Sequence, residues 1–165
     1  MPAPDPDHLL DQAKALAKRR GQGRPRQVDL RRAISAAYYA LFHAVLGAAA
    51  DEFVGTSKRG SKIHTLAYRS VDHKRVKDIC SQLDSGKLSD YAPPSGFTVN
   101  LLRFAAVFKS LQEERHSADY DPEYGPTAAD ADAEIAAARK ALERFRAAPA
   151  VQRRTFLGLL LFKPR

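Results

Sequence analysis

The sequence predicts an all-α protein: an up-down helical bundle with two long central helices and shorter flanking helices. Apolar residues recur at three- and four-residue intervals along most of the chain, which is the spacing of one helix face. The two-residue alternation of strands and the Asn-Gly signals of hairpins are missing from the sequence. A length of 165 residues with 44% hydrophobic residues suits one domain with a core, so we expect a single domain over residues 1–165.

The first part of the chain predicts a short helix followed by a long one. An amphipathic helix runs from Asp7 to Arg20, where the glycines and the proline of the next five residues end it. Its apolar side consists of Leu9, Leu10, Ala13 and Leu16. The long helix runs from Asp29 to Ala50. Its core stripe consists of Leu30, Ile34, Ala37, Leu41, Ala44 and Ala48.

The middle of the chain predicts shorter elements. A basic, glycine- and serine-rich loop covers Gly55–Lys62, and two short helices follow at Ile63–Arg69 and Asp72–Leu83. The next stretch, Asp84–Gly96, contains two glycines and two prolines, so it is a surface connection.

The second long helix is predicted over Thr98–Asp119, and Pro122 prevents it from continuing. A capping box starting at Thr127 begins another helix, which ends before Pro149. That helix is expected to bury Ile135, Ala138, Leu142 and Phe145. The last helix, about 151–162, is apolar on nearly every side, so we expect it to pack on the bundle or on a partner.

The net charge of +8 comes from 27 Lys and Arg against 19 Asp and Glu. Residues 1–80 hold 15 of the basic and 8 of the acidic residues, whereas residues 81–165 hold 12 and 11. Such an asymmetry is typical of proteins that bind a polyanion, most often nucleic acid, although basicity also serves solubility alone.

Several features bound the location of the protein. A single cysteine, Cys80, rules out an internal disulfide. The N-terminal MPAPDPDHLL lacks the basic flank and apolar run of a signal peptide. The longest uninterrupted apolar run is Phe156–Phe162, far shorter than the roughly 20 residues that span a membrane. We therefore expect a cytoplasmic protein without membrane association.

The most informative stretch lies at the end of the Thr98–Asp119 helix. Arg115 continues the apolar stripe by one step and Asp119 follows four residues later, so a buried arginine has a local partner. His116 and Tyr120 have the same spacing on the adjoining stripe. Guanidinium binds phosphate, imidazole moves protons near neutral pH and phenol stacks, so these four are candidate catalytic residues. The alternative is a structural ion pair beside a solvent-facing histidine.

A polar line lies next to the core stripe of the Asp29–Ala50 helix. Ser35, Tyr39 and His43 follow one another at four-residue intervals, and Arg32 precedes them. These four are candidate ligand-binding residues; the alternative is ordinary packing at the edge of the core. Ser35 and His43 are about 12 Å apart along the helix, which argues against a nucleophile–base pair.

The basic loop adds Lys58, Arg59 and Lys62 as candidate phosphate contacts. It is not a P-loop, because residues 60–62 read Gly-Ser-Lys instead of Gly-Lys-Ser/Thr and a helix precedes them. A solvated surface loop is the alternative. The five histidines are scattered and none is paired at the spacing of a helical zinc site, so we expect no metal and no cofactor.

The sequence resembles the HEPN superfamily over about residues 5–162. The resemblance is carried by RRAISAAYYALFHAV in the first long helix and ERHSADYD at the end of the second, with FLGLLLF near the C-terminus. It implies an all-α, HEPN-like bundle that forms homodimers with a cleft along the dimer axis. Nuclease members cut RNA without metal, and many are toxins silenced by an antitoxin. Others bind RNA or nucleotides, or pair with a small nucleotidyltransferase.

The resemblance assigns Arg115 to the arginine of the family motif. The family histidine would then fall at residues 120–122, where this chain has Tyr-Asp-Pro. Asp119 and Tyr120 match an Asp-Tyr variant of the motif, and if the chain is an endoribonuclease toxin, Tyr120 is a candidate target for modification by a partner nucleotidyltransferase.

Three functions follow. The first is an HEPN-like protein that binds RNA or nucleotide, as part of a toxin–antitoxin or defence system. The second is an active metal-independent endoribonuclease toxin, in which Arg115 stabilises the phosphorane and His116 or Asp119 handles the proton. The third is an adaptor dimer without nucleic acid, suggested by the apolar C-terminal helix.

Overall fold

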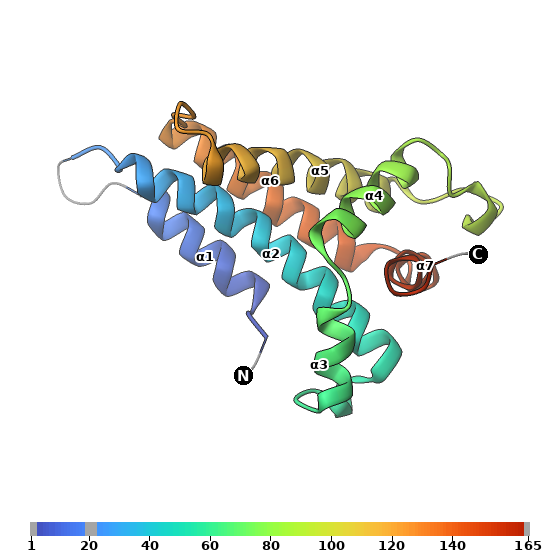
Figure 1. The fold of residues 1–165 in the computed structure, drawn as a ribbon. Helices are drawn as coiled ribbons and strands as arrows, with labels where there is room; N and C mark the ends of the chain where they lie inside the picture. Colours follow the sequence, from blue (N-terminus) through green and yellow to red (C-terminus); the bar gives the residue numbers. More distant parts are fainter. Residues whose placement is uncertain (1–2, 19–22, 164–165) are drawn as a thin grey trace.

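A computed structural model describes residues 3–18 and 23–163, and these form seven α-helices, two one-turn 3₁₀ helices and no strand (Figure 1). The all-α prediction is confirmed. The α-helices are α1 Pro6–Ala17, α2 Gln27–Val54, α3 Lys62–Arg69, α4 His73–Asp84, α5 Val99–Tyr120, α6 Ala128–Ala147 and α7 Ala150–Leu161. The 3₁₀ helices are Thr56–Lys58 and Ser89–Tyr91. Arg19, Arg20 and Gly21, where the first helix was predicted to end, lie outside the described residues.

Helix α2 is the axis of the bundle and packs against α1, α5, α6, α3 and α7 (Figure 1). Its stretch 33–50 contains no charged residue. By length and composition α2 is therefore long and apolar enough to cross a membrane, a signal that counting uninterrupted apolar runs misses. Of its most apolar stretch, 61% is buried inside the bundle, as expected for a central core helix. The fold is compatible with a soluble protein.

Helix α7 crosses the end of the bundle and is seen end-on in Figure 1. Its Phe156 is fully buried and contacts Phe104 of α5 and Phe145 of α6, with ring centroids 6.0 and 6.2 Å apart. The Phe104 and Phe145 rings are 4.8 Å apart. The bundle itself therefore covers the buried face of α7, which consists of Phe156, Leu157, Leu159 and Leu160, whereas Val151 and Phe162 at its two ends are exposed.

Most predicted core positions are buried, including the four on α6, and the Thr127 capping box is present. Thr127 Oγ1 accepts from Asp130 N at 3.1 Å, and the Asp130 carboxylate accepts from Thr127 N at 2.8 Å. Two positions of the predicted core stripe on α2 are only partly buried: Ala44 and Ala48 pack against the edge of the core and line a cavity.

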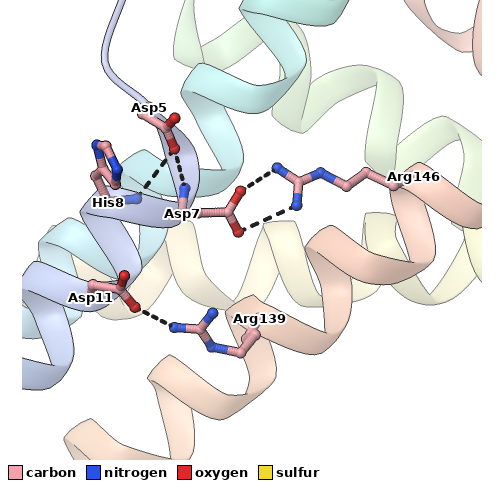
Figure 2. Close-up of polar contacts among 6 residues, drawn as sticks. All are labelled: Asp5, Asp7, His8, Asp11, Arg139 and Arg146. Atoms are coloured by element: carbon pink, nitrogen blue, oxygen red, sulfur yellow. Dashed lines mark hydrogen bonds and ion pairs between the residues drawn. The ribbon is translucent and has the colours of Figure 1, made fainter.

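Ion pairs attach α1 to α6, as Figure 2 shows. Asp7 receives two hydrogen bonds from Arg146, the shorter 2.7 Å, and Asp11 lies 3.0 Å from Arg139. Asp5 caps α1 by accepting from the backbone N–H groups of Asp7 and His8 at 2.9 and 3.2 Å. The hydrogen bond from Arg146 holds the pKa of Asp7 below its ordinary value of 3.8, against a smaller opposing effect of burial.

We predict that Asp7→Asn lowers stability in a pH-dependent way. A carboxyl with a lower pKa in the folded state stabilises the fold above its unfolded pKa, and this contribution is lost as the pH falls through the folded pKa. The pair is about half exposed (47% and 52%), so the loss at neutral pH is at most about 1 kcal/mol. Urea melts should show the difference shrinking below pH 3.8.

The matched control is Asp132→Asn, which removes an exposed carboxylate of α6 that contacts no described residue. It should leave the urea midpoint nearly unchanged. A loss for Asp7→Asn of the same size at pH 3 and pH 7 would contradict the role given to the ion pair.

Candidate functional site

The site is built where the buried stripe of α5 reaches the end of the helix. Phe108 and Leu111 are fully buried, and Arg115 comes next on the same face with 17% of its side chain exposed. Arg115 Nε lies 2.7 Å from Asp119 Oδ2, so the predicted ion pair is confirmed. The Nε–H group of Arg115 is buried, and it does not point at Asp119 closely enough for a hydrogen bond. This N–H donor therefore has no hydrogen-bond acceptor.

Helix α2 provides the other half of the site. Arg115 Nη2 donates to Tyr39 Oη at 2.7 Å, and Ser35 Oγ donates to Asp119 Oδ1 at 2.5 Å. Sequence spacing put these residues on two separate helices, and the structure brings them together. We call Ser35, Tyr39, Arg115 and Asp119 the Arg115 cluster.

Aromatic rings surround the guanidinium. Its central carbon lies 5.9, 5.3 and 5.6 Å from the ring centroids of Tyr38, Tyr39 and Tyr120. Burial disfavours the charge, but Tyr39 and Asp119 outweigh it, so the pKa of Arg115 is raised and the cation persists.

The outer edge of the cluster carries two exposed aromatic side chains. Tyr120 is 65% exposed, and its ring lies 5.0 Å from that of His116, which is also exposed. Their four-residue spacing on α5 puts them on one stripe, as predicted. Their planes are tilted by 51°, and together they offer two accessible aromatic rings next to a fixed cation.

His73, the first residue of α4, is a site residue that the sequence did not reveal. Its ring lies 3.9 Å from that of Phe42, and its Nδ1 is 2.6 Å from Tyr38 Oη. Burial, together with the positive charge of Arg115, lowers the pKa of His73, against an opposing effect of Asp72. The imidazole is therefore neutral near pH 7 and has Nε2 as its open atom. Sequence spacing could not predict that His73 on α4 lies near Arg115 on α5, because the two residues belong to different helices.

The two arginines at the start of α2 have different roles. Arg32, a predicted ligand-binding residue, is exposed and forms no hydrogen bond or ion pair with the described residues. Arg31 donates to the carbonyl oxygens of Ala118, Pro122 and Tyr124, at 3.4 Å and 3.1 Å for the first two. It therefore satisfies the carbonyls at the C-terminal end of α5 and fixes the position of the site.

The other predicted ligand-binding residues lie elsewhere. Asp51 follows Tyr39 by 12 residues on α2, about 18 Å along the axis, and its carboxylate holds Arg59 at 2.8 Å. His43 and Arg59 line a cavity of 1160 Å³, and neither Lys58 nor Lys62 is among the lining residues. Of the three cations of the loop, Arg59 is paired with a carboxylate. Lys58 and Lys62 are exposed.

Metal ligands are not gathered anywhere in residues 3–18 and 23–163: no three His, Cys, Asp or Glu residues there lie in a suitable group. Burial raises the pKa of the Cys80 thiol, which therefore stays protonated at neutral pH.

Comparison of the chain with family models, curated proteins and solved structures finds no match in any of the three.

We predict that Arg115→Gln raises the pKa of His73. Removing a positive charge makes protonation easier, and burial keeps part of the original depression in place. An NMR pH titration of the His73 ring protons measures the midpoint directly.

The control is Arg103→Gln, an exposed position on α5 twelve residues from Arg115, or about 18 Å. That variant should leave the His73 midpoint in place. Identical His73 midpoints in Arg115→Gln and the unmodified protein would show that Arg115 does not act on this imidazole.

Proposed function

We propose that this chain is an HEPN-type RNA-binding protein and that the Arg115 cluster is its phosphate site. The observation that carries the proposal is a fixed, partly exposed guanidinium next to an open aromatic surface. RNA-binding proteins use this combination: a cation contacts the phosphate, and aromatic rings stack on unpaired bases.

Arg115 retains donors for a phosphate. Its Nε faces Asp119, one Nη2 proton goes to Tyr39, and Nη1 contacts no described acceptor. Guanidinium has five N–H donors, so phosphate can bind to the open side without displacing Asp119. Arg32, exposed on α2 one turn before Ser35, adds a second cation near the cluster.

The net charge of +8 supports the proposal, since it attracts any polyanion. Tyr120 and His116 supply the stacking surface. The resemblance of the two long helices to the HEPN superfamily adds to this reading, with Arg115 at the family arginine. The homodimer and the antitoxin or nucleotidyltransferase partner that the resemblance implies remain predictions.

A metal-independent endoribonuclease is the second candidate, because two imidazoles lie near Arg115. Both oxygens of Asp119 are already in contact with Ser35 and Arg115, so the carboxylate is poorly available as a base. His116 is open to solvent, and His73 leaves Nε2 free when its Nδ1–H donates to Tyr38. Either histidine could accept a proton from the attacking hydroxyl while Arg115 stabilises the phosphorane. The adaptor-dimer alternative has less support, since most apolar side chains of α7 are buried in its own bundle.

RNA binding is expected to depend on Arg115 and Tyr120. A charge-assisted hydrogen bond contributes about 1.5–3 kcal/mol and a stacked base about 1–3 kcal/mol, so Arg115→Ala should weaken binding about tenfold or more and Tyr120→Ala about fivefold or more. Arg115→Ala should also reduce the slope of log affinity against log salt by about 1, because one phosphate contact is lost. Fluorescence anisotropy with a labelled single-stranded RNA measures both.

Tyr91→Ala is the matched control, an exposed tyrosine in the connection before α5 and far from Tyr120. It should bind RNA as the unmodified protein does. Thermal melting by circular dichroism separates loss of contact from loss of fold, most importantly for the partly buried Arg115. RNA affinity unchanged in a folded Tyr120→Ala and in Arg115→Ala would eliminate the phosphate site.

RNA cleavage distinguishes the second candidate. An endoribonuclease of this kind should cut RNA in EDTA, lose at least about 100-fold in rate as Arg115→Ala, and lose a similar factor as His73→Gln or His116→Gln. Gel analysis of a labelled RNA follows the cut. Cleavage that persists in Arg115→Ala would point to a contaminant, and binding without cleavage leaves the RNA-binding function alone.

A further inference from the structure

Helix α3 is turned with its aliphatic side chains outward. Its two branched aliphatic residues, Ile63 and Leu66, are 56% and 62% exposed. The buried residue of α3 is instead a polar one, His64, which is 8% exposed. A surface helix of a soluble protein normally buries its apolar stripe and exposes its polar one. The orientation of α3 is therefore the reverse of what burial within this bundle would favour.

Polar contacts with α2 hold α3 in this orientation. His64 and Tyr68 are four residues apart and share one side of α3. His64 Nε2 lies 3.0 Å from Asp51 Oδ1, and Tyr68 Oη lies 2.5 Å from His43 Nδ1. Helix α3 packs against α2 and has no comparably extensive contact with another helix. These contacts leave the opposite side of α3 uncovered.

The uncovered side combines aliphatic and cationic groups. We call Lys62, Ile63, Leu66 and Arg69 the outer face of α3, and all four are exposed. Leu66 is three or four residues from each of the others, so it is the neighbour of all three on the helix surface. Lys62 and Arg69 form no hydrogen bond or ion pair with the described residues. The outer face therefore has an aliphatic centre with an unpaired cation on either side.

The charge around the outer face has one sign. Residues 53–71 contain four basic residues and no Asp or Glu. Arg59 is paired with Asp51, whereas Lys58 is exposed like Lys62 and Arg69. Helix α3 and the loop before it project from the bundle at the C-terminal end of α2 (Figure 1). A broad anionic surface can therefore reach the outer face at this end of the molecule.

We propose that the outer face of α3 binds the surface of an anionic lipid bilayer. Ile63 and Leu66 enter the boundary between headgroups and acyl chains, and Lys58, Lys62 and Arg69 lie among the anionic headgroups. Surface binding of this kind needs no spanning helix. It revises the expectation of a protein without membrane association, which rested on the lack of a spanning segment. The outer face is separate from the Arg115 cluster, so the proposal does not depend on the proposed RNA site.

The chemistry of the outer face favours a bilayer over other partners. Aliphatic side chains offer an RNA neither a hydrogen bond nor a ring for stacking. A stable protein interface covers about 800 Å² on each partner. The 8 residues of α3 form a helix only about 12 Å long, which is small for such an interface. A bilayer needs only a small apolar insertion together with several cations.

Co-sedimentation of the full chain with lipid vesicles tests the proposal. Vesicles of equal parts phosphatidylcholine and phosphatidylglycerol should bind the protein, and pure phosphatidylcholine should bind it at least about tenfold more weakly. Leu66→Gln should weaken binding about fivefold or more, because its side chain no longer gains from leaving water. Lys62→Gln should weaken it by a similar factor, because one cation is lost.

The matched controls are Val99→Gln and Arg103→Gln, an exposed aliphatic residue and an exposed cation on α5, which has no extensive contact with α3. Both should bind vesicles as the unmodified protein does. Thermal melting of Leu66→Gln should match that of the unmodified protein, because the side chain is exposed, and its affinity for RNA should be unchanged.

Two results with vesicles would overturn the proposal: no binding of the unmodified protein to the anionic vesicles, or equal binding by Leu66→Gln and the unmodified protein. Light scattering identifies a different occupant. If Leu66→Gln turns a dimer into a monomer, a second copy of the chain covers the outer face, and the proposal is wrong. If Leu66→Gln weakens RNA binding instead of vesicle binding, the face belongs to the RNA site, and the proposal is equally wrong.

Discussion

The arrangement of the two central helices depends on a cation placed at the end of a buried apolar stripe. A guanidinium that is 17% exposed needs an opposite charge nearby, and α5 supplies it by the ion pair with Asp119. The remaining contact comes from Tyr39 on α2, and Ser35 binds the far oxygen of Asp119. These two hydrogen bonds attach α2 to α5 at the point where the rings of Tyr120 and His116 are exposed to solvent.

Residues on one face of α2 contribute both to the Arg115 cluster and to the cavity. Tyr39 and His43 are one turn apart and their ring centroids are 6.0 Å apart, yet Tyr39 contacts Arg115 whereas His43 contacts Tyr68 in the cavity. The end of α5 lies next to the N-terminal part of α2, whereas α3 lies beside its C-terminal part (Figure 1). The small residues Ala44, Gly47 and Ala48 on the C-terminal half of α2 remain partly exposed and line the cavity.

Sequence periodicity correctly predicts the features that depend on residues within one helix. It predicted the helices, the Thr127 capping box, the Arg115–Asp119 pair and the line through Ser35, Tyr39 and His43, because each depends on residues three or four apart. It could not show which line of α2 meets which end of α5, since helix packing decides this. His73 was missed for the same reason, and Ala44 and Ala48 were placed in the core because spacing cannot show how completely the neighbouring helices cover a face.

The central claim is that the guanidinium of Arg115 meets the phosphate of an RNA, and the side-chain signal of Arg115 in a ¹⁵N-resolved NMR spectrum reports on this directly. Its Nε–H is buried and free of an aligned acceptor, so it is sensitive to a new anion nearby. Titration with a short single-stranded RNA should shift this signal in step with those of Tyr120 and His116. An Arg115 signal that stays in place while other arginines respond would contradict the account.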